Sequence, residues 1–339
     1  MIDLGEIVVG NLPDDHIESA QILFGLAPPV PQKFARFATE VAAKALGGIL
    51  ANRAERWADF DVAVREYGEP VEGACVSVIV PLYGRIDFVE HQLLEFSRDP
   101  FFRANVDLIY VLDDPRLVDR FFEQAPLLYE IYSVPFRAVW GNANRGFSGA
   151  NNLGASIAKA EKLLFLNSDV FPQHSGWLES LLAVLEDERV GAVAPRLVFA
   201  DGSIQHAGMS FRRRGDLEIW VNHHPNMGLD PELDPSGQAL TAMPALTGAC
   251  LAMRGRDFHA VGGWDTGYLV GDFEDSDLCL KLRSMGKLVM YQPRVQLTHL
   301  ERQSFALLGE SDFRFRVVIF NASRHQSRWQ SLLEGEPSV

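Results

Sequence analysis

The sequence predicts an α/β fold in which helices cover both faces of a mostly parallel central sheet. From about residue 74, short β-branched runs alternate with amphipathic segments, which is typical of parallel strands joined by right-handed crossovers. Polar residues follow several of these runs, at the strand ends where open α/β sheets bind ligands. The chain has 339 residues, 47% of them hydrophobic, which is enough for one large core or two smaller ones.

Residues 1–73 have a different pattern and predict an N-terminal helical extension. Phe34, Phe37, Val41 and Ala45 recur near helical spacing, and Pro31 stands where a helix can begin. Two interpretations remain open. The helices pack on the main domain, or they form a docking element through which the chain makes a homo-oligomer.

The main domain is predicted to span residues 74–304. We expect its strands at 75–84, 106–114, 136–142, 162–170, 190–202, 246–254 and 295–299. We expect its helices at 85–99, 115–132, 146–160, 174–188 and from about 274 to 285. Residues 210–240 are rich in Pro, Gly and charge and predict a loop or flap, and residues 305–339 predict a C-terminal helical tail.

Composition excludes several classes of protein. The net charge is −14, from 31 Lys and Arg against 45 Asp and Glu, so we expect no nucleic-acid partner. Cys75, Cys250 and Cys279 are far apart, which predicts neither a disulfide framework nor a zinc knuckle. The first residues lack the pattern of a signal peptide, and no run approaches the length of a membrane span. These features predict a cytoplasmic protein.

Four carboxylates crowd the segment from residue 272 to residue 277: Asp272, Glu274, Asp275 and Asp277. A helix is expected from about Glu274, and the pair Asp272 and Asp275 resembles a capping box. A cap accounts for two of the four acids. The others call for nearby positive charge or for a role as proton acceptors.

The sequence lacks several common phosphate-binding and catalytic motifs, and this absence limits the kinds of nucleotide site that we expect. The loop "PLYGRIDF" lacks the glycines of a dinucleotide site, and no P-loop is present. The segment "GFSGA" has Ala150 where a nucleophile elbow needs glycine, and the acidic cluster lacks the glycine of an EF-hand. What remains is a diphosphate bound through Mg²⁺ or Mn²⁺, held by a strand-end carboxylate such as Asp169. By itself, an aspartate there is more often a turn former.

Eight segments resemble, in order, the motifs of family 2 glycosyltransferases of the GT-A fold, with the bacterial rhamnosyltransferase-like branch nearest. The segments are VSVIVPLYGR, VLDD, NRGFSGANNLG, LLFLNSDV, LTGACLAMR, VGGWD, EDSDLCLKLR and THLERQS. The resemblance covers residues 75–304. It implies an inverting, metal-dependent transfer of a sugar from a UDP- or dTDP-sugar to a hydroxyl of a glycan or lipid-linked glycan. It also implies surface polysaccharide synthesis, with peripheral contact at the inner face of the membrane.

The resemblance also implies a site, residue by residue. The nucleotide site would comprise Pro81, Tyr83, Asp113, Arg145, Asn151, Asn167, Ser168 and Asp169. Asp169 would bind Mn²⁺ or Mg²⁺ together with His299, while Asn167 takes the place of the first acid of the family's D-x-D motif. Thr247 and Gly248 would lie at the donor sugar. A chain that starts near Glu72 is expected to keep nucleotide binding.

Asp275 would be the base that takes the acceptor's proton, with Glu274 orienting the acceptor or sharing that role. The amides of the helix start are expected to keep Asp275 ionised. Asp272 and Asp277 are then left for the helix cap and for pairing with basic residues.

Two alternatives to a glycosyltransferase remain. A nucleotidyltransferase that makes nucleotide-sugars would need a glycine- and lysine-rich first loop, which "PLYGRIDF" does not provide. A non-catalytic glycan-binding module is disfavoured because Asp169, Asp275 and His299 are all present.

Overall fold

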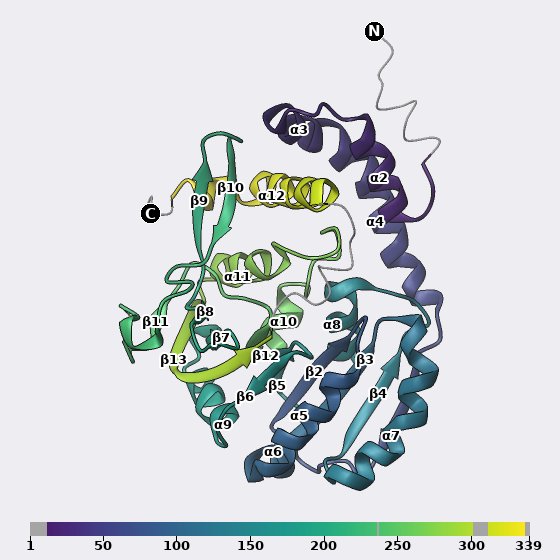
Figure 1. Ribbon diagram of the computed structural model, residues 1–339, viewed down its shortest axis with the longest axis vertical. Helices are drawn as coiled ribbons and strands as arrows, with labels where there is room; N and C mark the ends of the chain where they lie inside the picture. The colour runs from purple at the N-terminus through teal and green to yellow at the C-terminus, as the bar shows by residue number, and fades with distance from the viewer. Residues whose placement is uncertain (1–11, 236, 301–310, 336–339) are drawn as a thin grey trace.

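The computed structural model describes residues 12–235, 237–300 and 311–335, and a mixed sheet lies at their centre (Figure 1). Across this sheet the strands lie in the order β1 (Ala63–Tyr67), β4 (Phe136–Trp140), β3 (Val106–Leu112), β2 (Val76–Leu82), β5 (Lys162–Leu166), β12 (Cys250–Arg254), β7 (Val190–Val198), β13 (Leu288–His299) and β11 (Thr241–Ala242). Short strands β6 (Val170–Pro172) and β8 (Ile204–His206) pair with β13 and β7. Strands β4, β3, β2 and β5 run parallel, as does the pair β7 and β13. The predicted α/β class is confirmed.

Helices lie on both faces of the sheet and in a group beyond its strand ends (Figure 1). The helices are α2 (His16–Leu26), α3 (Pro31–Phe37), α4 (Ala43–Arg56), α5 (Asp87–Arg98), α6 (Pro100–Asn105), α7 (Val118–Tyr132), α8 (Gly146–Ser156), α9 (Trp177–Leu182), α10 (Gly255–Ala260), α11 (Glu274–Ser284) and α12 (Ser311–Leu333). A π-helical turn, η1 (Ala38–Ala42), joins α3 to α4. Single 3₁₀ turns are η2 (Trp57–Asp59), η3 (Pro115–Leu117), η4 (Ala183–Glu186) and η5 (Pro231–Leu233).

Strand β2 is buried on both faces, which explains its continuous apolar run. Val78 and Val80 pack into a core with α5, α7 and α9, whereas Ile79 packs into a second core with α8, α10 and α11. Helix α8 comes very close to the sheet at Gly154, where an added Cβ would lie 2.4 Å from Ile79 Cγ2. The two cores hold the carboxyl ends of β2, β3 and β5 at fixed positions.

A third core joins elements from both ends of the chain. It contains residues of α2, α3, η1 and α4, of α12, and of the loop that leads into α11. Phe24, for example, lies 5.2 Å from Phe34 and 5.8 Å from Phe320, measured between ring centroids. The described part of the N-terminal extension therefore packs on the rest of the chain, as the first of its two interpretations expects.

Two segments differ from the sequence-based prediction. Residues 63–67, expected in the helical extension, form β1 and pair antiparallel with β4. The residues of β1 are mostly exposed. The strand therefore lacks the alternation of buried apolar and exposed polar side chains by which a strand is predicted from sequence. Within the predicted 210–240 loop, β9 (Ser210–Arg214) and β10 (Ile219–His223) form a hairpin. Its turn residue Leu217 and Ile219 enter the third core, and this burial stabilises the hairpin.

The boundary expected at 304–305 lies outside the described residues.

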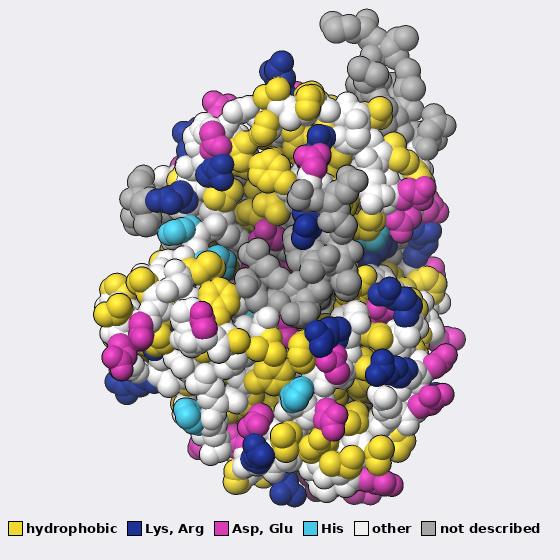
Figure 2. Space-filling view, in the orientation of Figure 1, with side chains coloured by type: hydrophobic (Ala, Val, Ile, Leu, Met, Phe, Trp, Pro, Cys, Tyr) yellow, Lys and Arg dark blue, Asp and Glu magenta, His cyan; other side chains and the backbone are white. Residues whose placement is uncertain are grey.

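Among the described helices, none combines the length and the apolar character that crossing a membrane would require. On the face shown in Figure 2, basic side chains are dispersed among acidic ones rather than gathered in a stripe.

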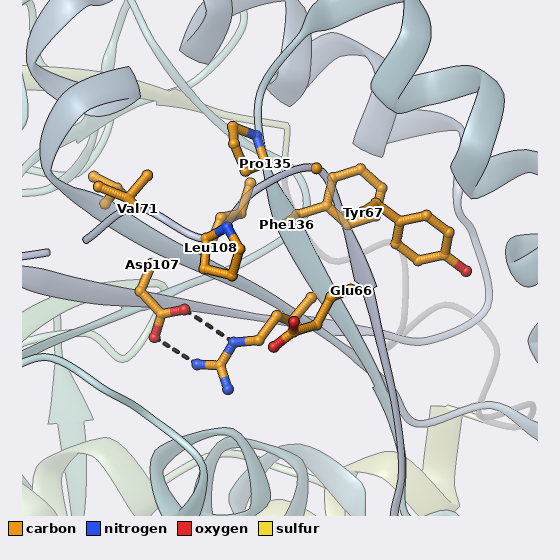
Figure 3. Close-up of a pocket in the computed structure, with 11 residues that line it drawn as sticks. Glu66, Tyr67, Val71, Asp107, Leu108, Pro135 and Phe136 are labelled. Carbon is orange, nitrogen blue, oxygen red and sulfur yellow. Dashed lines mark hydrogen bonds and ion pairs between the residues drawn. The ribbon is translucent and has the colours of Figure 1, made fainter.

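A buried ion pair stabilises the amino ends of the parallel strands, opposite the polar strand ends. Arg137 on β4 binds Asp107 on β3 through two hydrogen bonds, Nε to Oδ1 at 2.9 Å and Nη2 to Oδ2 at 2.5 Å (Figure 3). Ser77 Oγ donates a further hydrogen bond to Asp107. The cavity beside the pair has a volume of about 20 Å³. That is room for about one water molecule and not for a substrate.

We expect Asp107→Asn to destabilise the protein by about 3–5 kcal/mol, because it leaves the Arg137 charge buried without its counter-ion. The measurement is urea unfolding followed by circular dichroism. Glu40→Gln is the control, since Glu40 pairs with Arg36 at an exposed surface, and its effect should stay below about 1 kcal/mol. Equal effects of the two variants would contradict the structural role of the buried pair.

Candidate functional site

A cavity of about 750 Å³ lies at the carboxyl ends of β2, β3 and β5. Its other walls come from the end of α4, the loop before α11 and the end of β13. The predicted site residues that line it are Pro81, Tyr83, Asp113, Arg145, Asn167, Ser168, Asp169, Thr247, Gly248, Glu274, Asp275 and His299. One cavity therefore brings together residues from seven predicted motifs.

Asn151 does not line this cavity. Its side chain is fully buried on α8, where Nδ2 donates to the carbonyl of Phe147 at 3.0 Å. The residue faces the helix and its core rather than the strand ends. The expectation that Asn151 flanks a bound nucleotide is therefore not supported by its position.

Asp113 and Arg145 form a buried corner of the cavity. The Arg145 backbone N–H donates to Asp113 Oδ1 at 2.6 Å, and the Arg145 guanidinium donates to the carbonyl of Gly141 at 2.9 Å. Burial raises the pKa of Asp113 to about 7, against the lowering effect of these amides and of Arg53. Arg145 is only 9% exposed, so it is a structural part of the wall rather than a surface charge.

The Asn167-Ser168-Asp169 turn follows β5 and is held from both sides. Gln92 on α5 donates to the carbonyl of Asn167 at 2.9 Å, and the N–H of Leu300 donates to the carbonyl of Asp169 at 3.0 Å. Since β6 pairs with the end of β13, His299 stands opposite Val170. This pairing places His299 Nε2 at 3.2 Å from Asp169 Oδ1.

The Asp169–His299 pair fits a divalent cation. His299 Nδ1 lies 2.5 Å from Gln205 Oε1, so in this amide orientation Nδ1 carries the proton and Nε2 keeps a lone pair towards Asp169. Two ligands in adjacent octahedral positions around Mg²⁺ lie about 3 Å apart, which is close to the observed separation. Within the described ranges, no group of three or more His, Cys, Asp or Glu side chains suits a metal. Phosphate or water would have to complete the coordination.

The acidic helix α11 begins differently from the expected capping box. Its N-cap is Phe273, which has no side-chain hydrogen bond to offer, and Asp272 lies one residue earlier. Val270, Asp272 and Phe273 all have φ between 63° and 84°. Left-handed conformations at residues other than glycine cost about 1–3 kcal/mol each, so this loop must be held by its surroundings.

Glu274 and Asp275 share the cavity wall at the start of α11. Asp275 accepts the N–H of Gly248 through Oδ2 at 3.1 Å and that of Ser276 through Oδ1 at 2.8 Å. Burial raises the pKa of Asp275 despite these amides, so the expected lowering by the helix start is outweighed. Burial and then the neighbouring Asp275 raise the pKa of Glu274 far above its usual range. Burial therefore raises the pKa of both carboxyl groups, and the charge of Asp275 further disfavours ionisation of Glu274.

Asp277 faces away from the cavity and is fully buried. It accepts hydrogen bonds from Tyr268 at 3.1 Å and from Trp329 Nε1 at 2.8 Å. It also forms ion pairs with Lys281 at 3.2 Å and Arg328 at 3.0 Å. The expected pairing of Asp277 with basic residues is thus confirmed, and it explains one of the four crowded acids without catalysis.

Sequence reasoning missed the wall contributed by the N-terminal extension. Arg53 donates to the carbonyl of Asn144 at 2.8 Å, and the guanidinium carbons of Arg53 and Arg145 lie 4.9 and 5.5 Å from the centre of the Trp57 ring. The segment "NRAERW" at the end of α4 is basic and aromatic, which was the available signal. Because Arg53, Trp57 and Phe60 line the cavity, we no longer expect a chain starting near Glu72 to bind nucleotide normally.

Comparisons with known proteins relate part of the chain to a family. Residues 77–242 match the family described as "Glycosyl transferase family 2". The chain is 29% identical over 279 residues to the O-antigen biosynthesis protein RfbC of Myxococcus xanthus, covering 79% of this chain and 21% of that protein. It is 28% identical over 174 residues to an N-acetylglucosaminyl-diphospho-decaprenol L-rhamnosyltransferase of Mycobacterium tuberculosis, covering 47% of this chain and 54% of that protein.

The fold also matches a solved structure. A crystal structure of GalNAc-T7 with UDP, GalNAc and Mn²⁺ superposes with a TM-score of 0.56 at 15% identity, covering 77% of this chain and 50% of that one. This likeness supports the GT-A fold alone. The chain spans only about a fifth of the length of the Myxococcus protein and about half that of the mycobacterial one. The family match assigns residues 77–242, about half of the chain, to the family 2 glycosyltransferases.

Proposed function

We propose that the protein is an inverting, metal-dependent glycosyltransferase that moves a sugar from a UDP- or dTDP-sugar to a hydroxyl of a glycan. One observation carries the proposal. The Asp275 carboxylate accepts the Gly248 N–H and lines the cavity. Asp169 and His299, which lie 3.2 Å from each other, line the same cavity. A proton acceptor and a cation site facing one space are what displacement of a diphosphate by a hydroxyl requires.

The nucleoside would lie at the corner formed by Asp113, Arg145 and the N-terminal wall. Tyr83 is 38% exposed in the cavity and offers an aromatic face, while Pro81 precedes it at the end of β2. Asp113 still has an oxygen beyond the one bound to Arg145. That oxygen is an acceptor suited to an N–H of uracil or thymine or to a ribose hydroxyl.

The donor sugar would lie between this corner and Asp275, beside Thr247 and Gly248. Position 248 has no room for a larger residue, since an added Cβ would lie 2.9 Å from the Trp264 ring and 3.3 Å from Asp275 Cβ. The absence of a side chain therefore lets the backbone N–H approach the Asp275 carboxylate.

In the proposed step, the acceptor oxygen bonds to the anomeric carbon as the bond from that carbon to the diphosphate oxygen breaks. Asp275 takes the proton of the acceptor hydroxyl, and the diphosphate leaves with the electron pair. Attack opposite the leaving group inverts the anomeric configuration. Asp169 and His299 would hold Mn²⁺ or Mg²⁺, whose charge stabilises a leaving diphosphate.

The acceptor is proposed to be a glycan or a lipid-linked glycan of a surface polysaccharide. The Myxococcus relative is named for O-antigen biosynthesis, and the mycobacterial one for transfer to a diphospho-decaprenol acceptor. A lipid-linked acceptor would bring the protein to the inner face of the membrane by peripheral contact. Oligomerisation through the N-terminal extension remains a prediction.

The direct test is to incubate the protein with UDP- and dTDP-sugars and Mn²⁺ and to measure nucleotide release. A glycosyltransferase releases the nucleoside diphosphate, slowly to water and faster with an acceptor. A nucleotidyltransferase would release pyrophosphate from a nucleoside triphosphate and a sugar phosphate. A glycan-binding module would release neither. Either of the last two results would overturn the proposal.

Trp57→Ala should weaken UDP binding about tenfold, because Arg145 loses the ring that supports its guanidinium at the nucleoside corner. Calorimetry with UDP and Mn²⁺ provides the affinity. Arg36→Ala serves as the control, because Arg36 lies on the exposed face of α3. If Trp57→Ala binds UDP as tightly as this control, the N-terminal wall takes no part in the nucleotide site.

Asp169→Ala should abolish the Mn²⁺-dependent part of UDP binding while leaving the thermal transition near that of the wild type. The reason is that the variant removes the carboxylate of the cation pair without disturbing the backbone contacts of the turn. Asp201→Ala is the control, since that exposed carboxylate bonds only within its own turn in the described structure. Equal affinity with Mn²⁺ and with a chelator in the wild type would refute the metal assignment.

Asp275→Asn should lower kcat by about 10²- to 10⁴-fold, because the amide can accept the Gly248 N–H but cannot take a proton. Donor affinity should be retained. Glu274→Gln should have a milder effect, as expected for a residue that orients the acceptor without taking its proton. A dead Glu274→Gln beside an active Asp275→Asn would exchange the two roles, and full activity in both would leave the mechanism without its base.

A further inference from the structure

Helix α12 lies outside the segment that matches the family, yet it contacts the start of the acidic helix. The family match ends at residue 242, and α12 begins at Ser311. Val317 and Phe320 of α12 share the third core with Leu269 and Phe273, which flank the strained turn before Glu274. Figure 1 shows α12 beside α11, with the N-terminal helices at its other side.

Asn321 of α12 binds the backbone of this turn through every polar group of its amide. Its Oδ1 accepts the N–H of Leu269 at 3.0 Å. Its Nδ2 lies within hydrogen-bond distance of the carbonyls of Leu269, Gly271 and Asp272, at 3.0, 2.9 and 3.2 Å. The side chain is fully buried, so water cannot replace these bonds.

The next two turns of the same helix face extend the contact into α11. His325, four residues after Asn321, lies with Nε2 at 3.2 Å from Ser276 Oγ, which in turn donates to the carbonyl of Phe273. Trp329, four residues further, donates from Nε1 to Asp277 at 2.8 Å. Residues spaced by four share a helix face, so one face of α12 follows the chain from Leu269 to Asp277.

The position of these contacts gives them a role beyond stability. Val270, Asp272 and Phe273 are left-handed, and the carboxylates of Glu274 and Asp275 follow directly. A rotation of the backbone at Asp272 or Phe273 would turn both carboxylates away from the cavity. Of the three carbonyls held by Asn321, that of Asp272 belongs to a residue where the rotation would occur, and those of Leu269 and Gly271 fix the chain just before it.

We propose that Asn321, assisted by His325 and Trp329, is a positioning residue that holds the turn 269–273 so that Glu274 and Asp275 face the cavity. This inference rests on the proposed function, because it assigns the two acids to catalysis. It makes α12 part of the catalytic apparatus, although no residue of α12 lines the cavity in the described structure.

The test uses Asn321→Asp, which keeps the size and the acceptor but removes the donor to three carbonyls. Hydrogen–deuterium exchange on the ligand-free protein should show the amides of 269–277 exchanging about tenfold faster. UDP affinity should be unchanged, since the nucleoside corner lies at other strand ends. With a sugar donor, kcat should fall by about 10- to 100-fold, as expected when reacting groups shift by a fraction of an ångström to an ångström.

Gln326→Ala is the matched control on the same helix. Gln326 accepts the N–H of Trp220 at 2.9 Å and thus ties α12 to the β9–β10 hairpin, not to the turn. It should keep kcat even where its thermal stability falls as far as that of Asn321→Asp. If Asn321→Asp does not fold, Asn321→Ser replaces it as the test variant. It retains one hydroxyl donor, so we expect the same changes in exchange and kcat with smaller magnitudes.

The outcomes separate the two proposals. Faster exchange with unchanged kcat, or unchanged exchange, would overturn the positioning role while leaving the glycosyltransferase intact. A loss of kcat in Gln326→Ala equal to that in Asn321→Asp would reduce α12 to a general stabiliser. A wild-type protein that turns over no sugar nucleotide would overturn the proposed function. The contacts of Asn321 with the turn 269–273 would then have no catalytic role.

Discussion

Two carboxylates, Glu274 and Asp275, lie next to each other in the wall of the cavity, and the rest of the site is arranged around that constraint. The Gly248 amide donates to Asp275 and offsets part of their repulsion, and burial raises the pKa of both. The helix that carries them begins without a side-chain cap, after a backbone turn that side chains normally disfavour. Such a start persists only where packing from elsewhere in the chain determines it. Here that packing is the third core, with Asn321 at its edge.

The sheet and much of the cavity could be predicted from the sequence because both depend on local pattern. Strand ends of a parallel sheet converge on one edge, so Asp113, Asn167 and Asp169 had to lie near one another once their strands were recognised. His299 joined them for a similar reason, since a late strand ended beside β6. The likeness to family 2 glycosyltransferases added the acids of α11 and the donor-sugar residues Thr247 and Gly248.

The parts that escaped prediction depend on contacts between distant segments. The residues of strand β1 are mostly exposed, and only its pairing with β4 makes it a strand. Trp57 lies in the cavity wall, where its ring contacts the Arg145 guanidinium. The spacing of residues along α4 does not predict a contact with a residue so much later in the chain. Asn151 differs from the expectation in the opposite way, because it does not line the cavity. Its motif matched, but the helical turn directs its side chain to the Phe147 carbonyl instead of the cavity.

The third core has a consequence for synthesis of the chain on the ribosome. Phe24 packs against Phe34 and against Phe320, and Phe320 is made roughly 300 residues after Phe24. At translation rates of about 5–20 residues per second, α12 is made tens of seconds after α2 and α3. During that time the apolar faces of α2 and α3 lack their contacts with α12. The sheet, whose strands follow one another closely, can form during that interval. Because Asn321 binds the backbone of the turn before Glu274, that turn can gain these contacts only after α12 has been made.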